Sequence, residues 1–117
     1  MARKTGPTAA QVEAVMQRSG GLCERCGRQG EQVHHRRPRG AGGTRDVSIN
    51  YPSNLLHLCA MCHETVEHNR DWARSKGFLV SRISVDGPAD VPVWRYQSEW
   101  VLFLDDGGIE VIERDDD

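Results

Sequence analysis

Two adjacent histidines stand directly in front of a group of arginines in the segment VHHRRPRG, Val33 to Gly40. An imidazole titrates near neutral pH, so it can bind a metal ion or accept a proton. A guanidinium group binds phosphate through its planar fork of hydrogen-bond donors. The segment is therefore a candidate place where nucleic acid is held and attacked, and the rest of the chain must supply the missing groups.

The four cysteines form two Cys-x-x-Cys pairs, CERC at Cys23 and Cys26 and CAMC at Cys59 and Cys62. Two such turns can present four thiolates to one tetrahedral zinc ion. The alternatives are disulfides in an exported protein, or a redox-active pair beside a spare pair. We favour structural zinc because MARKTGPTAAQ lacks the apolar core of a secretory signal, and thiolates in a reducing cytosol bind metal. We therefore expect a cytoplasmic protein.

The charge is unevenly distributed, although the net charge is only −2. Residues 1–82 contain 13 Lys and Arg against 7 Asp and Glu, whereas residues 83–117 contain 2 against 10. The first part favours an anionic partner such as DNA, and the second part repels one. The apolar runs are too short to cross a membrane, so we expect no membrane contact.

Capping and periodicity signals predict a helix from about Thr8 to Ser19, with Thr8 and Gln11 as a capping box. Residues 32–36 and 54–58 are predicted as two strands joined by a long loop rich in glycine and arginine. One helix is expected from about Cys62 to a stop at Gly77. These elements amount to a hairpin followed by a helix.

The C-terminal part is predicted to form short strands, with DDGG turning 100–104 back against 109–112 and an acidic end that frays. Its aromatic side chains could be mistaken for a base-stacking platform, yet they lie among acids and alternate like strand core. We interpret them as packing. They are Trp94, Tyr96, Trp100 and Phe103.

The spacing of the histidines assigns them to different faces. His63 and Glu67 are four residues apart, so they share one helix face and can both address an ion. His68 points away, although a register error of one residue would make it the ligand instead of Glu67. Neighbours in a strand face opposite sides, so His34 and His35 are expected to have different roles. One side chain faces the helix and the other faces the substrate.

In chain order these segments give His, Asn and His, and CERC, VHHRRPRGAGG and NLLHLCAMCH resemble the HNH endonucleases. The resemblance runs from Cys23 to about Gly77. It implies an α+β fold in which a ββα-metal core is braced by a four-cysteine zinc site. The expected organisation is an HNH nuclease domain with an N-terminal helix over residues 1–82, followed by an acidic β-strand appendage over 83–117.

The resemblance also implies an activity, the metal-dependent hydrolysis of phosphodiester bonds in double-stranded DNA. It implies His34 and His63 as ligands of the catalytic ion. By the same resemblance His35 is the general base, and Asn54 holds the hairpin loop so that this base is aimed. Glu67 stands where the nuclease colicins have a third histidine ligand, and a carboxylate there favours Mg²⁺ or Mn²⁺, with Ni²⁺ and Zn²⁺ left open.

A group of arginines beside the base is expected to hold phosphates without reading sequence. These are Arg36, Arg37, Arg39 and Arg45. His57, between two leucines, is interpreted as structural. The resemblance to small bacteriophage HNH endonucleases implies a packaging terminase as a further partner and the host cytoplasm as the location, and we expect a monomer.

Two rival interpretations lack nuclease activity, and the first of them keeps the same scaffold. A zinc-dependent DNA-binding or adaptor protein would bind DNA without cutting it, and a thiol-disulfide redox protein would carry reactive thiols. A pure binder has no need of a base beside an ion, so the order His, Asn, His favours the nuclease.

Overall fold

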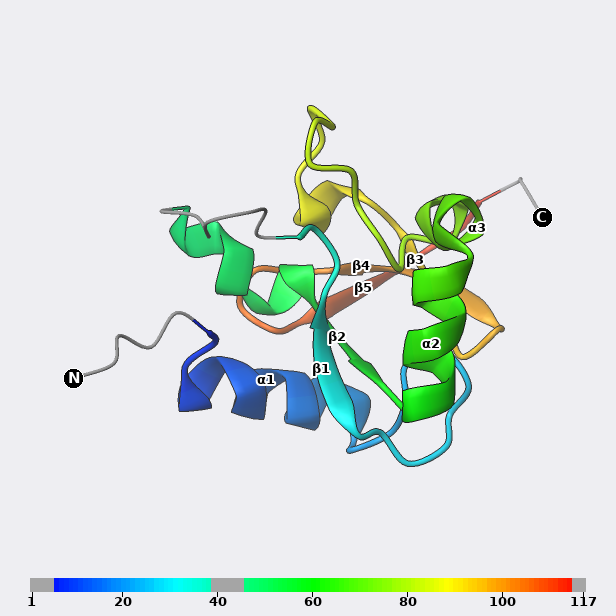
Figure 1. Cartoon of the computed structure of the whole chain (residues 1–117). Coiled ribbons are helices and arrows are strands. Elements are labelled where there is room, and N and C mark those ends of the chain that lie inside the picture. Colours follow the sequence, from blue (N-terminus) through cyan, green and yellow to red (C-terminus); the bar gives the residue numbers. More distant parts are fainter. Residues whose placement is uncertain (1–5, 39–45, 115–117) are drawn as a thin grey trace.

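The computed structural model describes residues 6–38 and 46–114, which combine helices with two small antiparallel sheets in an α+β arrangement (Figure 1). Within these residues no helix has both the length and the apolar character needed to cross a bilayer. The acidic end that we predicted to fray lies outside the described residues from 115 onward. The helices and strands are α1 (Ala9–Ser19), β1 (Gln32–His35), β2 (Leu55–Leu58), α2 (Ala60–His68), α3 (Arg70–Ser75), β3 (Val93–Arg95), β4 (Glu99–Phe103) and β5 (Ile109–Ile112), with short 3₁₀ helices η1 (Val47–Asn50), η2 (Pro52–Asn54) and η3 (Pro88–Asp90).

Helix α1 begins with the predicted capping box. The Thr8 hydroxyl accepts from the Gln11 backbone N–H at 3.1 Å, and the Gln11 side chain accepts from the Thr8 N–H at 2.8 Å. Gly20, with φ of 64°, ends the helix in the left-handed region. Val15 is fully buried on its inner face. The prediction for this helix is confirmed.

Strands β1 and β2 form an antiparallel hairpin in which His34 lies opposite Leu56 and His35 opposite Leu55. Both strands are shorter than predicted. Asn54 does not open the second strand, because Pro52 starts a 3₁₀ turn and the Asn54 N–H donates to the Tyr51 carbonyl at 2.8 Å. The strand therefore begins one residue later than expected, with all four of its residues buried.

The single long helix that we predicted is two helices. Asn69 leaves the helical region at φ −136° and ψ 59°, and its side chain donates to the Thr65 carbonyl at 2.8 Å, which satisfies the end of α2. Gly77 then ends the α3 segment with φ of 79°. A Cβ at this position would collide with the Pro92 carbonyl, so the turn requires glycine.

The C-terminal part is a three-stranded sheet in the order β3-β4-β5, and the predicted hairpin pairs Trp100 with Ile112 and Phe103 with Ile109. Phe103 is fully buried and Trp100 nearly so. The rings of Trp94 and Trp100 lie 5.2 Å apart between centroids. These aromatic side chains pack within the fold, as their alternation predicted.

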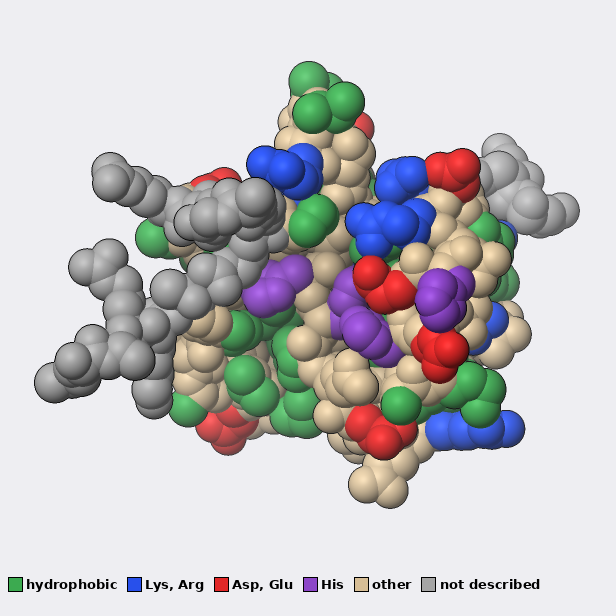
Figure 2. All heavy atoms as spheres, viewed as in Figure 1, with side chains coloured by type: hydrophobic (Ala, Val, Ile, Leu, Met, Phe, Trp, Pro, Cys, Tyr) green, Lys and Arg blue, Asp and Glu red, His purple; other side chains and the backbone are tan. Residues whose placement is uncertain are grey.

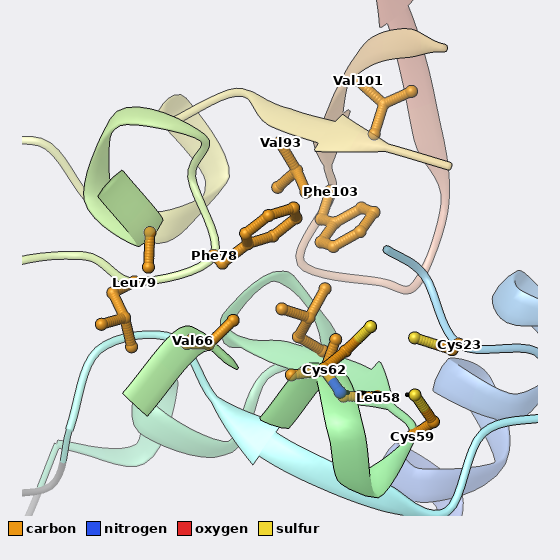
Figure 3. Packing of buried hydrophobic residues seen from close by; sticks show 12 residues of the cluster. Cys23, Leu58, Cys59, Cys62, Val66, Phe78, Leu79, Val93, Val101 and Phe103 are labelled. Atoms are coloured by element: carbon orange, nitrogen blue, oxygen red, sulfur yellow. Dashed lines mark hydrogen bonds between the residues drawn. The ribbon is translucent and has the colours of Figure 1, made fainter. Parts of the chain in front are cut away.

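One hydrophobic core joins the hairpin and helices to the C-terminal sheet (Figure 3). Val66 of α2 and Phe78, which follows α3, lie in this cluster with Val101 and Phe103 of β4. Cys23 belongs to the same cluster. The acidic C-terminal part therefore closes the core of the part that carries the histidines.

Candidate metal centres and active site

The four cysteines converge on one point. Their sulfur atoms all lie within 4.8 Å of one another, and the Cys26 and Cys59 sulfurs are 3.8 Å apart. A tetrahedral zinc ion with Zn–S bonds of about 2.3 Å places its sulfurs about 3.8 Å apart. Backbone N–H groups also point at sulfur, as that of Cys62 does toward Cys59 at 3.4 Å. The donor set and its spacing fit a structural zinc ion.

Burial of Cys62 disfavours a free thiolate there. Burial raises the pKa of the Cys62 thiol to about 12, although the Arg25 guanidinium, 3.2 Å from its sulfur, acts in the opposite direction. Without an ion this buried thiol would keep its proton at neutral pH. Zinc binding replaces such protons, so the metal and the fold are coupled.

A second cluster joins β1 to α2. The ligand atoms of His34, His63 and Glu67 all lie within 4.8 Å of one another. The two imidazole rings meet edge to face with centroids 5.3 Å apart. His63 and Glu67 share a helix face because they are one turn apart, and β1 brings His34 against that face. Two imidazoles and a carboxylate are a common ligand set for a divalent ion.

The surroundings of His34 suit a metal ligand. Its Nε2 is buried and has no hydrogen-bond partner among the described residues. Burial, helped by the nearby His63 and His35, lowers the pKa of His34 to about 4, so the ring is neutral at pH 7. A neutral imidazole nitrogen has a lone pair to offer, and a buried orphan nitrogen is costly unless it is used. The site therefore fits a divalent metal.

His35 turns away from this cluster, as the strand alternation predicted. Its Nε2 lies 2.8 Å from Oδ1 of Asn50 in η1. Since an amide oxygen only accepts, Nε2 carries the proton and Nδ1 is the basic nitrogen. Asn50 could not be predicted as a partner of His35, because an asparagine in an irregular loop has no periodicity or spacing that marks it.

Asn54 clamps the loop that carries these groups. Its Oδ1 accepts from the Arg37 N–H at 2.7 Å, and its Nδ2 donates to the Ile49 carbonyl at 2.8 Å and the Arg37 carbonyl at 3.1 Å. The side chain is fully buried. It thereby ties the end of β1 to η1, which carries Asn50.

The histidines face an open pocket of about 430 Å³. Figure 2 shows several His side chains gathered in the middle of the face in view, beside acidic and basic side chains. The pocket is wide enough to admit a phosphate group. Its lining consists of Val33, His34, His35, Pro38, His63, Glu67, Arg70 and Leu79.

The other two histidines lie elsewhere. The His68 side chain is 72% exposed, lies 3.9 Å from Glu64 and lines a different hollow from that of the His34 cluster. His57 is buried, with Nδ1 3.1 Å from the Ser19 hydroxyl. Burial lowers the pKa of His57. It joins β2 to the end of α1, which is the structural interpretation that the sequence analysis gave.

The prediction that Arg36 binds DNA is wrong. Its side chain is fully buried, and within the described residues its guanidinium donates to backbone carbonyls. Burial lowers the pKa of Arg36 to about 9, so the group stays charged at neutral pH and needs these acceptors. The acceptors are the carbonyls of Gly77 at 2.8 Å, Ser53 at 2.7 Å, Pro88 at 2.9 Å and Val91 at 2.7 Å.

Arg37 is half-buried and binds the loop after Val80. Its Nε donates to the Ser81 carbonyl at 3.2 Å, and its Nη2 donates to the Ser84 and Asp86 carbonyls at 2.9 and 2.7 Å. It holds this loop in place. Arg39 and Arg45, the other two predicted phosphate contacts, lie outside the described residues.

A hairpin followed by a helix, with histidines from both at one pocket, defines the class of ββα-metal domains. The model of the HNH endonuclease family matches residues 23–70, which include both cysteine pairs, the paired histidines and α2. Residues 23–70 are therefore similar to the HNH endonuclease family, as the motifs predicted. No curated protein and no solved structure matches the chain.

Proposed function

We propose that the protein is a metal-dependent endonuclease that hydrolyses phosphodiester bonds of double-stranded DNA. The observation that carries the proposal is the histidine pocket. It combines three converging ligand side chains with a neighbouring imidazole, His35, whose tautomer is set by Asn50. The HNH family match supports the same class of chemistry.

In this proposal His35 is the general base. With Nε2 donating to Asn50, Nδ1 takes a proton from the water that attacks the phosphorus. Such assistance is typically worth ~10²–10⁴-fold in rate. Asn54 acts through the loop, because it fixes the turn from which Asn50 reaches His35.

His34, His63 and Glu67 would hold the catalytic ion in the same pocket. A divalent ion bound there would stabilise the negative charge that builds up on the phosphate and on the departing oxygen. The nitrogen-rich set suits Mn²⁺, Ni²⁺ or Zn²⁺, and its carboxylate also admits Mg²⁺. The four-cysteine zinc is a separate, structural ion.

The proposal is tested by the conversion of supercoiled plasmid to nicked and linear forms. Zinc-loaded protein is assayed without added ion and with Mg²⁺, Mn²⁺ or Ni²⁺, alongside His35→Ala and the control His68→Ala. We expect metal-dependent cutting by the wild type and by His68→Ala, and none by His35→Ala. DNA that is bound but left intact under every ion would instead favour the adaptor interpretation.

We extend the proposal to a monomer that acts in the host cytoplasm beside a packaging terminase. Its support is the resemblance to small bacteriophage HNH endonucleases, together with the acidic C-terminal part, which is unsuited to DNA but could meet a basic protein surface. Light scattering of the purified protein tests the monomer. Co-purification with a terminase subunit tests the partner. Failure of the terminase subunit to co-purify would contradict the proposed partnership.

A further inference from the structure

We infer that a hollow between α3 and the segment 79–83 binds the sugar-phosphate backbone of the DNA strand that enters the histidine pocket. The inference rests on the proposed function, because that function places the DNA phosphate that is cut in the histidine pocket. The hollow measures about 520 Å³. It is lined by Pro38, Arg70, Arg74, Leu79, Val80, Ser81, Arg82 and Ile83.

The hollow continues the histidine pocket. Pro38, Arg70 and Leu79 line both, so the two concave surfaces meet along these residues. A strand whose scissile phosphate lies at the histidines therefore passes directly into the hollow with its next nucleotides. Neither surface is enclosed, which suits an extended polymer better than a small molecule.

The charge of the hollow matches a phosphate backbone. Three arginines and no carboxylate are among its lining residues. Arg82 is exposed and makes no hydrogen bond or ion pair with the described residues. Arg74 forms an ion pair with Asp71 at the rim of the hollow, and the Asp71 side chain is 97% exposed. An exposed pair of this kind is worth little, so the guanidinium is free to exchange its carboxylate for a phosphate.

The apolar wall of the hollow matches the deoxyribose between phosphates. Ile83 is 91% exposed, so its aliphatic side chain is available to contact a sugar. Arg37 holds the loop behind it through the Ser81, Ser84 and Asp86 carbonyls, so the wall is fixed. The loop stands out at the top of Figure 1, and Figure 2 shows hydrophobic side chains at its tip.

The contact would position the strand rather than read its sequence. Guanidinium groups on an open surface beside an apolar wall face phosphates and sugars, which are the same in every nucleotide. The hollow replaces the buried Arg36 as the source of phosphate contacts. It was not predicted, because Arg70, Arg74 and Arg82 are scattered along a helix and a loop and form no run in the sequence.

The test is the salt dependence of DNA binding by fluorescence anisotropy, with a labelled duplex and His35→Ala as the background so that nothing is cut. Arg74→Ala, Arg82→Ala and the double variant are compared with Arg28→Ala. Arg28 is exposed on the first cysteine turn, away from the hollow, and matches them in charge. Between about 50 and 200 mM salt each phosphate contact contributes about 0.9 to the slope of log K against log salt.

We expect Arg74→Ala and Arg82→Ala each to reduce the magnitude of the negative slope by about 0.9, and the double variant to reduce it by about 1.8. Arg28→Ala should leave the slope unchanged. An unchanged slope in the double variant, or an equal loss in Arg28→Ala, overturns the inference. Cleavage is measured separately on the protein with His35 intact. If the protein never nicks plasmid but the double variant still has a less steep salt dependence, the hollow binds DNA and the proposed nuclease activity is wrong.

Discussion

The His35 Nε2 and the Asn50 Oδ1 lie 2.8 Å apart, although fifteen residues separate them in the chain. Asn50 ends η1, whose Ile49 carbonyl is bound by Asn54. The orientation of the proposed base therefore depends on the buried Asn54 through one short turn. This gives the asparagine of the HNH pattern a physical task, which is to support the loop rather than to touch the substrate.

Asn50→Ala should lower the cleavage rate about tenfold, because a hydrogen bond worth ~1.4 kcal/mol no longer orients His35. Asn50→Asp is the matched variant, since it keeps an acceptor oxygen at the same place and should retain more activity than the alanine variant. Single-turnover nicking rates at saturating protein measure both. An alanine variant as fast as the wild type would show that Asn50 does not position the base.

Glu67→Ala should weaken binding of the catalytic ion about tenfold or more, whereas His68→Ala should not change it. The reason is geometric, because the Glu67 carboxylate lies in the His34 cluster and His68 faces solvent beside Glu64. Calorimetric titration of zinc-loaded protein with Mn²⁺ gives both affinities. A loss confined to His68→Ala would transfer the ligand role to that residue.

Cys59→Ala should lose zinc and the cooperative thermal transition together. Its sulfur is one of four around the site, and it also caps α2 by accepting from the Cys62 N–H. Structural zinc contributes ~10–16 kcal/mol in small zinc domains, which is as large as the whole stability of a typical domain. Metal content and a melting curve test this, with the exposed Met61→Ala in the same turn as the control. A cooperative melt at the wild-type temperature would contradict it.

Arg36→Ala should lower the free energy of unfolding by ~3–5 kcal/mol, because it empties a buried site and leaves backbone carbonyls unpaired. Arg36→Lys should also destabilise the protein, since one ammonium cannot replace a planar fork. Urea denaturation measures both, beside Arg28→Ala, for which we expect no change. Full stability in Arg36→Lys would mean that the fork geometry is unimportant.

Features encoded within a few residues could be predicted from the sequence. The Cys-x-x-Cys pairs, the Thr8–Gln11 capping box and the DDGG turn each carry their geometry in local chemistry. Strand alternation and helical spacing predicted that one of His34 and His35 faces the helix, and the family resemblance implied that it is His34, whose ring lies beside that of His63. That prediction needed only the placement of one hairpin and one helix.

Two features could not be predicted, one because distant contacts set it and the other because two local conformations compete closely. Arg36 stands in a run of arginines that suggests a surface, and only the fold brings the Pro88 and Val91 carbonyls to its guanidinium. The break at Asn69 has no proline or glycine to announce it. Its cause is a side chain that satisfies the carbonyl four residues earlier, which competes closely with continuing the helix.

The four acceptors of Arg36 also bear on how the histidine and cysteine motif of residues 23–70 can be moved into another protein. Three of them, the carbonyls of Gly77, Pro88 and Val91, lie beyond residue 70, where the family match ends. An excised cassette of residues 23–70 would keep every histidine and cysteine but would lose three of the four carbonyls that hold the Arg36 guanidinium at the end of β1. A chimaeric protein built from this chain must therefore include the C-terminal sheet together with the motif.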